Sequence, residues 1–490
     1  MAEEIEPHIY RKYEFMQRLG KGAYGIVWKA VERKTKQVVA VKKVFDAFHN
    51  DTDAQRTFRE VMILQELDHE NMIKLYNVIK AENNKDIYLI FEYMETDLHA
   101  VIRSEILKDI HKVYIVYQIL NSLLYLHSAQ IIHRDLKPSN ILINSECLVK
   151  LADFGLARSA LPYDENTAPV MTEYVATRWY RAPEIVLGSS HYSKAVDMWS
   201  VGCILGELII GKALFPGKST INQIELILDL LGKPKPEDLE EIGGSNEFNS
   251  INFNSKQKYT FSSFFKGASK DALDFLKRSL EFNPKKRITV EEALAHPFVK
   301  HVRSPATEIK SPKIIQIPIS DQKKLTVKEY REALYADIIQ KKKEQRKKWQ
   351  INYLKQLGIN VTEDQNMEVM QTKVVNKQSS NTLQQGHSST LPAQKSSTLG
   401  QQPVSKEAKP VSNPSHYEPK PDLPPHMKNG TTYKAPTKDE SSLKDGQAHP
   451  VQKAKTTGGG LSSNGASGLQ AGKSNMVYHP YIHNMMKDKT

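Results

Sequence analysis

Hydrophobic and polar positions alternate along much of the first ninety residues. Apolar or β-branched residues follow strand-like patterns in five segments, separated by a glycine-rich loop and polar turns: 13–19, 26–31, 37–43, 73–78 and 87–93. Between the third and fourth of these, a helical spacing of apolar residues runs over 53–67, with Phe58, Val61, Met62, Leu64 and Leu67. The pattern predicts a small β-rich lobe that carries one helix.

From about Leu98 onwards the apolar spacing becomes helical. Helices are predicted at 111–127 (HKVYIVYQILNSLLYLH) and at 196–211 (VDMWSVGCILGELIIG). Residues 233–268 are polar and lack a clear period, which favours a surface insertion. Residues 325–340 (LTVKEYREALYADIIQ) form an amphipathic helical pattern. A larger helical lobe and one further helix are therefore expected after the β-rich lobe.

The composition changes near residue 350. All 15 Phe lie at or before Phe298 and all 4 Trp before residue 350, whereas residues 351–490 contain no Phe, Trp, Cys or Arg. That part is rich in Ser, Gln, Lys, Pro and Gly. Such a composition cannot bury enough apolar surface to offset the entropy of ordering the chain, so 351–490 is predicted to be a disordered tail.

Composition and charge exclude several classes of protein. The 490 residues carry a formal net charge of +12, which is not concentrated among interleaved aromatic residues, so no specific nucleic-acid binding is expected. The one dense basic run, 341–349, is interpreted as a solvated helix end, with a localisation or anionic-surface signal as the alternative. Two cysteines, Cys147 and Cys203, exclude a disulfide framework or a Cys-based zinc module. No run approaches about 18 apolar residues and the acidic N-terminus is unlike a signal peptide, so a soluble intracellular protein is expected.

The first chemical motif is the glycine-rich loop Gly20-Lys21-Gly22-Ala23-Tyr24-Gly25. A GxGxxG pattern alone is weakly specific, and a dinucleotide-binding turn would require a helix to open at the third glycine. Here a strand-like segment beginning at Ile26 and Val27 follows instead. Glycines let the backbone approach phosphates closely, so the loop is interpreted as a flap over a nucleotide, with Val27 against the base.

A cation follows on the next apolar strand. Lys42 ends the run Val39-Ala40-Val41-Lys42, where its ammonium can neutralise phosphate charge. Such a side chain needs a partner to position it, and Glu60 on the predicted helix 53–67 is the natural one. Taken alone, a lysine on a strand is usually only a surface charge.

The most specific signal is the run His133-Arg134-Asp135-Leu136-Lys137-Pro138-Ser139-Asn140, followed by Asp153-Phe154-Gly155. Phosphoryl transfer requires mainly positioning and electrostatic stabilisation. Asp135 supplies a carboxylate to orient an acceptor hydroxyl, and Lys137 a cation beside the transferred phosphate. Asn140 and Asp153 supply the oxygen ligands that Mg²⁺ prefers. The alternative, a polar loop that only caps helices, does not account for this order and spacing.

Together these motifs resemble those of a eukaryotic Ser/Thr protein kinase, over about 13–299. Ala182-Pro183-Glu184, Asp197 and an Arg287 expected to pair with Glu184 complete the resemblance, and a pseudokinase is not expected because no essential group is missing. The resemblance implies an α+β, bilobal fold with a small antiparallel β-sheet lobe and a larger, mainly helical lobe. It divides the chain into an N-terminal extension (1–12), the kinase domain (13–299, with an insertion at about 217–270), a C-terminal extension (300–350, with a helix at about 325–348) and the tail (351–490).

The resemblance also implies cofactors and site residues. ATP and Mg²⁺ are the expected cofactors, with Lys42, Glu60, Asp135 and Lys137 as catalytic residues and Asn140 and Asp153 as metal ligands. Phe91 is the expected gatekeeper before the hinge. The residues expected to contact ATP come from the glycine loop, the neighbouring strands and the hinge: Leu19, Gly20, Lys21, Gly22, Ala23, Tyr24, Gly25, Ile26, Val27, Ala40, Lys42, Glu92, Met94 and Asp97.

Finer motifs are similar to mitogen-activated protein (MAP) kinases of the extracellular-signal-regulated type. Thr172-Glu173-Tyr174 is the family's dual phosphorylation motif, and segments 91–103 and 215–228 resemble the atypical long-tailed branch, the MAP kinase 15 class. The resemblance implies protein substrates with Ser/Thr followed by Pro. It also implies that Arg59, Arg134 and Arg158 meet phospho-Thr172, whereas Arg178 and Arg181 meet phospho-Tyr174.

One stretch departs from the family pattern. MAP kinases usually carry paired acidic residues after the helical lobe, but 300–313 (KHVRSPATEIKSPK) is basic and has Glu308 as its only acid. Docking of basic peptides at this position is therefore in doubt, as is dependence on an upstream kinase that docks there. Autophosphorylation is the expected route to activation.

Two other functions share part of this sequence pattern. A cyclin-dependent-type kinase shares several motifs, but Thr172-Glu173-Tyr174 and the helix sequence RTFREVMIL argue against it. A scaffold acting through the tail is the alternative from another class, with Pro421-x-x-Pro424 as a polyproline ligand for an SH3-type partner. The resemblance allows cytoplasm, nucleus and ciliary basal body, and nothing in the sequence selects among them.

Overall fold

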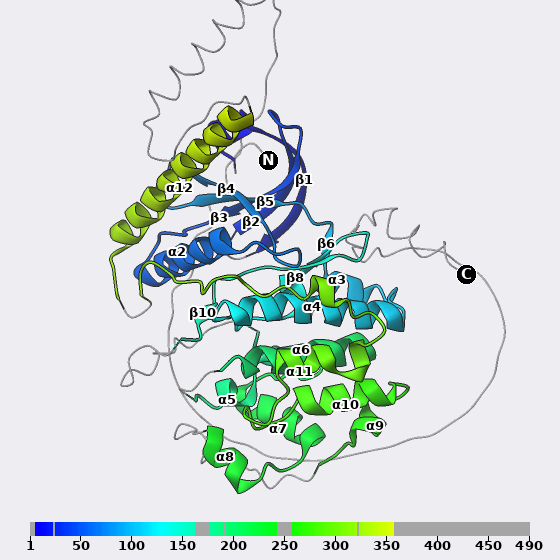
Figure 1. Cartoon of the computed structure of the whole chain (residues 1–490). Coiled ribbons are helices and arrows are strands. Elements are labelled where there is room, and N and C mark those ends of the chain that lie inside the picture. Colours follow the sequence, from blue (N-terminus) through cyan, green and yellow to red (C-terminus); the bar gives the residue numbers. More distant parts are fainter. Residues whose placement is uncertain are drawn as a thin grey trace, which may run out of the picture. The chain divides into compact units, whose positions relative to one another are not determined.

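The small lobe is built on a five-stranded antiparallel sheet, which the computed structural model shows in the spatial order β1-β2-β3-β5-β4 (Figure 1). The structure describes residues 5–22, 25–161, 177–189, 193–242, 257–320 and 323–356. The strands are β1 (Tyr13–Gly22), β2 (Gly25–Glu32), β3 (Val38–Val44), β4 (Leu75–Lys80) and β5 (Ile87–Glu92). All five predicted strand segments are confirmed, because alternating apolar residues are buried on the sheet faces.

The sheet packs against a core on each face. Trp28 and Val41 belong to a core on one face, where the short helix α1 (Pro7–Tyr10) contributes the fully buried Ile9. The N-terminal extension is thus part of the core of the small lobe. The predicted helix is α2 (Asp51–Glu66), which begins after Asn50, whose side chain accepts a hydrogen bond from the Asp53 backbone N at 2.9 Å. Its Phe58 and Met62 are buried in the larger core.

The second lobe is mainly helical, as predicted. Its helices are α3 (Leu98–Arg103), α4 (Asp109–Ser128), α5 (Pro183–Val186), α6 (Ala195–Ile210), α7 (Thr220–Leu231), α8 (Pro236–Ile242), α9 (Phe261–Phe264), α10 (Lys270–Ser279) and α11 (Val290–Ala295). Two small sheets lie between the lobes: β6 (Thr96–Asp97) with β8 (Ile141–Ile143) and β9 (Val149–Leu151), and β7 (Ile131–Ile132) with β10 (Arg158–Ser159). These short strands flank the loops that carry the predicted catalytic residues.

A buried ion pair holds the helical lobe together, as the resemblance implied. Arg287 Nη1 and Nη2 donate to Glu184 Oε1 and Oε2 at 2.7 and 3.0 Å, and the two side chains are 0 and 2% exposed. Arg287 also donates to the backbone oxygens of Glu281, Phe282 and Ala195. This bidentate pair is fully desolvated and joins α5, α6 and the segment before α11.

The helix of the C-terminal extension is longer than expected. α12 (Val327–Gln356) packs against α2 along the small lobe (Figure 1), with Tyr330, Leu334 and Ile338 buried. The expected end of this helix near 348, and the expected start of disorder at 351, are both wrong, because Ile351 and Leu354 are 5 and 1% exposed. The sequence signal for the longer helix is the apolar pair Ile351 and Leu354, three residues apart, which follows the basic run 341–349.

Other predictions fall partly outside the described residues. The described part of the expected insertion, about 217–270, contains α7, α8 and α9, and α7 buries Ile224, Ile227 and Leu228. The remainder of the tail, 357–490, including Pro421 and Pro424, lies outside the described residues. Among the helices that the structure describes, none is long and apolar enough to cross a membrane.

Candidate active site

The glycine loop joins β1 and β2 as a hairpin, with Gly20 opposite Val27 and Gly22 opposite Gly25. The glycines differ in what they do. A Cβ on Gly25 would lie 2.1 Å from the Lys43 carbonyl oxygen, so only glycine fits there, whereas a Cβ on Gly20 or Gly22 would meet nothing within 4 Å. The open backbone at Gly20 and Gly22 leaves room for a ligand to approach. Ala23 and Tyr24 lie outside the described residues.

Because side chains alternate between the two faces of a strand, the other residues expected at the nucleotide do not all lie on the same face of the sheet. Val27 and Ala40 lie on the face of the larger core, while Ile26 is fully buried in the core on the opposite face. The expectation for Ile26 is therefore corrected: it can contribute backbone atoms but not its side chain. Leu19, at 36% exposure, and the exposed Lys21 lie on the solvent side of the loop.

Lys42 and Glu60 are brought together as predicted. Lys42 Nζ donates to Glu60 Oε1 at 3.3 Å, joining β3 to α2. Burial disfavours the ammonium, but the carboxylates of Glu60 and Asp153 outweigh it and raise the pKa of Lys42 above 10.5. The lysine is therefore charged at neutral pH, as binding of a phosphate requires.

The catalytic-loop residues form one hydrogen-bonded group. Lys137 Nζ donates to Asp135 Oδ2 at 2.6 Å, and Asn140 Nδ2 donates to the backbone O and Oδ2 of Asp135 at 2.9 and 3.1 Å. The 3-10 turn Pro138–Asn140 places Asn140 next to Asp135. A carboxylate, a cation and an amide thus converge at one point in the described loop.

Asp197, on α6, anchors this loop through hydrogen bonds. Its Oδ2 accepts from the His133 backbone N and from His127 Nε2, and its Oδ1 accepts from the Arg134 backbone N, each at 2.9 Å. Burial opposes ionisation, yet the hydrogen bond and charge of His127 and the other donors lower the pKa of Asp197 below 3.8. The bonds also hold Arg134 in a left-handed conformation with φ 69°. α6 therefore determines where the catalytic loop lies.

Asp153 completes the group of polar residues that includes Lys42, Asp135 and Lys137, here called the cleft, and has a left-handed conformation with φ 63°. The next residue, Phe154, is fully buried and packs edge-on against His133 at 5.1 Å between ring centroids. Burial alone would raise the pKa of Asp153, but Lys42, Arg56 and Lys137 outweigh it and lower the pKa below 3.8. Asp153 is therefore an anion at neutral pH.

Arg56 was not predicted as a site residue from the sequence. Its Nη2 is 3.9 Å from Asp153 Oδ1, and a Cβ on Gly155 would lie 2.5 Å from its Nε, so Gly155 leaves the space that Arg56 fills. The available signal was spacing, since Arg59 and Glu60 follow Arg56 by three and four residues on α2, which places each of them on the same face as Arg56.

Comparisons with known proteins agree with this geometry. The protein kinase domain family matches residues 13–299. Extracellular signal-regulated kinase 2 of Dictyostelium discoideum is 60% identical over 353 residues, which cover 71% of this chain and 95% of that protein. Mitogen-activated protein kinase 15 of Xenopus laevis is 56% identical over 344 residues, covering 69% of this chain and 59% of that protein. The namesake protein of Caenorhabditis elegans is 48% identical over 349 residues, covering 70 and 74%.

The chain belongs to the MAP kinases, a branch of the protein kinase family. It is a serine/threonine protein kinase related to the MAP kinase 15 proteins, so phosphate transfer to Ser or Thr is its chemistry. The resemblance inferred from the sequence motifs is confirmed.

The kinase presents three of the predicted phosphate-binding arginines to one short segment after Phe154. Arg59 Nη1 donates to the Gly155 carbonyl at 3.2 Å, Arg134 Nη1 to that of Leu156 at 3.4 Å, and Arg158 Nη1 to those of Leu156 and Ala157 at 3.4 and 2.9 Å. They come from α2, the catalytic loop and β10, so three elements converge here.

The phosphorylation motif itself, with Thr172 and Tyr174, lies outside the described residues. Of the arginines expected at Tyr174, Arg178 Nη1 donates to the Lys218 carbonyl at 3.1 Å, which ties it to the segment before α7. Arg178 begins the 3-10 turn Arg178–Tyr180 and Arg181 follows it, with the Arg181 backbone N donating to the Arg178 carbonyl at 3.1 Å. The two arginines therefore lie at the two ends of one turn.

The hinge residues of the kinase have mixed roles. The Glu92 side chain accepts from the Lys74 backbone N at 2.7 Å and pairs with Lys150 at 3.1 Å, so it is occupied within the protein. Met94 is buried at 7% exposure. Asp97 Oδ1 caps α3 by accepting from the Ala100 backbone N at 2.9 Å, which leaves Oδ2 as the atom available to a ribose hydroxyl.

The residues present fit a Mg²⁺ ion with a nucleotide. Asn140 uses its Nδ2 for hydrogen bonds to Asp135, so its amide oxygen is the atom that it can offer to a metal. Asp153, 32% exposed and negatively charged, supplies a carboxylate. Oxygen donors of these two kinds suit Mg²⁺, and kinases in general use it with ATP.

The departure at 300–313 is clear in the structure. Arg303 Nε and Nη2 donate to Glu308 Oε1 and Oε2 at 2.8 and 3.0 Å. The only acid of this stretch is therefore neutralised within the kinase and gives no acidic docking patch.

Proposed function

We propose that the chain transfers the γ-phosphate of ATP, with Mg²⁺, to Ser or Thr followed by Pro, and that phosphorylation of Thr172 and Tyr174, largely by the kinase itself, activates it. The observation that carries the first part is the joined group of Asp135, Lys137 and Asn140, with Asp153 and the Lys42–Glu60 pair across the cleft. Phosphoryl transfer depends on such positioned charges.

The residues have distinct tasks in this proposal. Asp135 orients the substrate hydroxyl and accepts its proton, while Lys137, 2.6 Å from Asp135, offsets negative charge on the transferred phosphate. Lys42, positioned by Glu60, binds the remaining phosphates. Asn140 and Asp153 would hold Mg²⁺, which when bound neutralises the charge of the phosphate oxygens.

The Asp153→Asn variant tests the metal assignment. It removes a carboxylate from a cleft rather than from a packed core, so the fold should persist while Mg²⁺-dependent transfer is lost. Kinase assays across a range of Mg²⁺ concentrations, with thermal unfolding as the measure of folding, check both halves. Near-normal activity at low Mg²⁺ would contradict the role of Asp153.

Selection for Pro rests on the family relation and on Arg178. This arginine is anchored on the Lys218 carbonyl beside α7, and phospho-Tyr174 would engage it and shape the surface that receives the residue after the target. Of two peptides that differ only in carrying Ser-Pro or Ser-Ala, the Ser-Pro peptide should have a much higher kcat/KM with the doubly phosphorylated enzyme. Equal values would contradict this part of the proposal.

Activation by phosphorylation is supported by the convergence of Arg59, Arg134 and Arg158 at residues 155–157. A phosphate on Thr172 adds about −1.5 to −2 charges and three strong acceptors, which can replace backbone carbonyls as partners of these guanidinium groups. It would link α2, and with it Glu60 and Lys42, to the catalytic loop.

Self-activation is supported by the neutralised Glu308, since an upstream kinase would lack an acidic docking patch at 300–313. Mass spectrometry of residues 172–174 tests it on protein made in bacteria. Wild type should carry both phosphates, and Asp135→Ala should carry neither. Unphosphorylated, inactive wild type would show that a separate activating kinase is required.

A further inference from the structure

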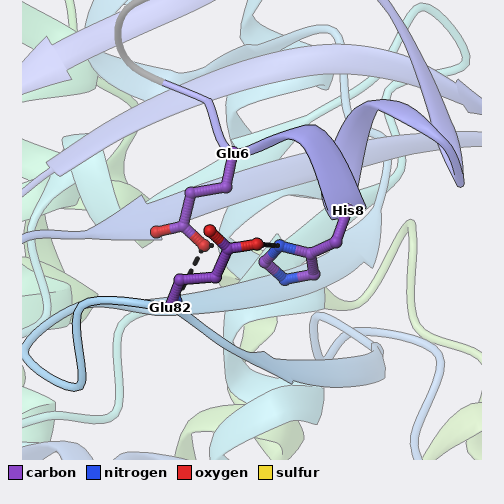
Figure 2. A group of neighbouring side chains, drawn as sticks. All are labelled: Glu6, His8 and Glu82. Carbon is purple, nitrogen blue, oxygen red and sulfur yellow. Dashed lines mark hydrogen bonds and ion pairs between the residues drawn. The ribbon is translucent and has the colours of Figure 1, made fainter.

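A second group of ionisable side chains lies in the small lobe, where the N-terminal extension meets the segment after β4. Glu6, His8 and Glu82 each offer a possible ligand atom, and these atoms all lie within 4.8 Å of one another. Figure 2 shows the two carboxylates reaching the imidazole from different segments of the chain. His8 and Glu82 are 74 residues apart, so folding rather than local sequence brings them together.

The hydrogen bonds of His8 determine which of its nitrogens faces the carboxylates. Nε2 lies 3.1 Å from the Lys80 carbonyl oxygen, which can only accept, so Nε2 carries the hydrogen. In a neutral imidazole the other nitrogen, Nδ1, is then an acceptor. It lies 3.1 Å from Glu82 Oε1 and 3.5 Å from Glu6 Oε2. In the metal-free protein a proton on Nδ1 can be donated to Glu82 Oε1, and a metal ion that displaced this proton would meet three electron-rich atoms, one from each residue.

The two separations measured from His8 suit a small metal ion. Zn²⁺ bonds of about 2.0–2.1 Å at tetrahedral angles place neighbouring ligand atoms about 3.3 Å apart. The two distances from His8 Nδ1, 3.1 and 3.5 Å, lie on either side of that value. A backbone carbonyl bonded to the second nitrogen of the histidine, as Lys80 supplies here, is the usual outer contact of metal-binding histidines.

Other contacts hold the carboxylates in place. Glu6 Oε2 accepts from the Glu82 backbone N at 2.9 Å, so the two segments that carry the acids are joined directly. The Glu6 backbone N donates to the Tyr88 hydroxyl at 3.4 Å. The Glu6 side chain is 15% exposed and that of Glu82 is 64% exposed. The group is thus anchored on one side and open to solvent on the other.

We propose that Glu6, His8 and Glu82 bind a divalent transition-metal ion, Zn²⁺ by preference, with water completing the coordination. Two carboxylates and a neutral imidazole balance the charge of the ion. The imidazole selects against Mg²⁺ and Ca²⁺, which prefer oxygen ligands, and a mixed nitrogen and oxygen set suits Zn²⁺. A cavity of about 320 Å³, lined by His8, Lys80, Ala81, Glu82 and Asn84, gives the ion a route from solvent.

The ion would stabilise the outer side of the small lobe. Ile5 and Ile9, on either side of Glu6 and His8, are buried in the core under the sheet. The Asn84 carbonyl, two residues after Glu82, accepts from Arg331 Nη1 of α12 at 3.0 Å. Metal binding would therefore fasten the N-terminal extension to a segment that also contacts the C-terminal helix.

The test is calorimetric titration of Zn²⁺ into the chelator-treated full chain, with Co²⁺ absorption as a spectroscopic readout. Wild type should bind one Zn²⁺ ion at this site. His8→Gln and Glu82→Gln should each weaken Zn²⁺ affinity by more than about 100-fold, because loss of a ligand weakens binding more than loss of an outer contact does. Zn²⁺ at about 100 times its Kd should raise Tm by about 5 °C in wild type but not in His8→Gln or Glu82→Gln. Glu14→Gln, which removes an exposed carboxylate paired with Arg33 on the same lobe, is the matched control.

Glu82 is exposed, so Glu82→Gln keeps the test valid if His8→Gln fails to fold, and Tm without metal reports folding of each variant. Zinc bound in the catalytic cleft would be insensitive to both substitutions. Three results would overturn the proposal: no Zn²⁺ binding by wild type, equal binding by Glu82→Gln and Glu14→Gln, or an NMR signal showing that His8 stays a doubly protonated imidazolium with Zn²⁺ present. The last would mean that a proton, not a metal, bridges the carboxylates.

Discussion

Two polar networks of this kinase, one in the helical lobe and one in the cleft, are built from similar residues but differ in solvent access. In the helical lobe, Arg287 and Glu184 are 0 and 2% exposed and meet through two hydrogen bonds, with further carbonyls on the guanidinium. In the cleft, Lys42 meets Glu60 through one contact of 3.3 Å and is 28% exposed.

The difference indicates what each network is for. A buried pair with all its hydrogen bonds made is costly to break, since loss of one partner leaves an unpaired charge without water. The cleft groups keep charge and hydrogen-bonding capacity that the protein does not use, which a nucleotide can take up. The helical-lobe network should therefore control stability, and the cleft network should control turnover.

The largest expected effect is that of Asp135→Asn on turnover. Loss of the general base should lower kcat by about 10²–10⁴-fold. Tm should stay close to that of wild type because the substitution preserves size and the amide oxygen can still accept from Lys137. Steady-state kinetics and thermal unfolding of the same preparation check both, and a large fall in Tm would show that Asp135 belongs to the stabilising network instead.

Next comes Arg287→Ala, which should lower the free energy of unfolding by about 3–5 kcal/mol because it strands the buried Glu184 carboxylate. The control is Arg278→Ala, which breaks an exposed pair with Asp274 and should cost at most about 1 kcal/mol. Denaturant unfolding measures both. Similar losses in the two variants would remove the distinction between buried and exposed pairs.

A smaller effect is expected from His69, next to the small lobe's β4. Burial, with the charge of Lys150, lowers the pKa of His69 to about 4, and its Nδ1 accepts from the Asn71 backbone N at 3.0 Å. The unfolded chain, with an ordinary pKa near 6.5, therefore binds a proton between pH 6.5 and 4 that the folded protein does not. Stability should fall by about 2 kcal/mol as the pH is lowered through this range.

Denaturant unfolding of His69→Gln should show a shallower pH dependence over that range. The control is His49→Gln, which removes an exposed histidine. An unaltered slope in His69→Gln would mean that His69 is not kept neutral by the fold.

The smallest effect is expected from removal of the residues after Gln356. A chain ending at Gln356 should keep the Tm and kcat of the full chain, because this truncation spares every buried residue of α12. A chain ending at residue 350 loses the buried Ile351 and Leu354, and should melt earlier. Aggregation or inactivity of the Gln356 chain would show that the tail folds onto the domain.

The strands, the helices and the catalytic motifs could be predicted from the sequence because each depends on residues near one another in the chain. Alternation indicated β2 and β3, and the spacing of Asp135, Lys137 and Asn140 indicated their chemistry, since one turn joins them. Nothing local specifies the contact of Lys42 with Glu60 or of Arg287 with Glu184. The first was expected because a long cationic side chain needs a partner to position it, and the second came only from the resemblance.

Only the tertiary structure decided which distant groups meet. Arg59 is 96 residues from Gly155, and His8 is 74 residues from Glu82. Such contacts depend on how α2, α1 and the segment after β4 pack against their neighbours, and no local period records that packing. The end of α12 was decided in the same way, because Ile351 and Leu354 are buried in the folded protein beyond a run whose charges resembled the end of a helix.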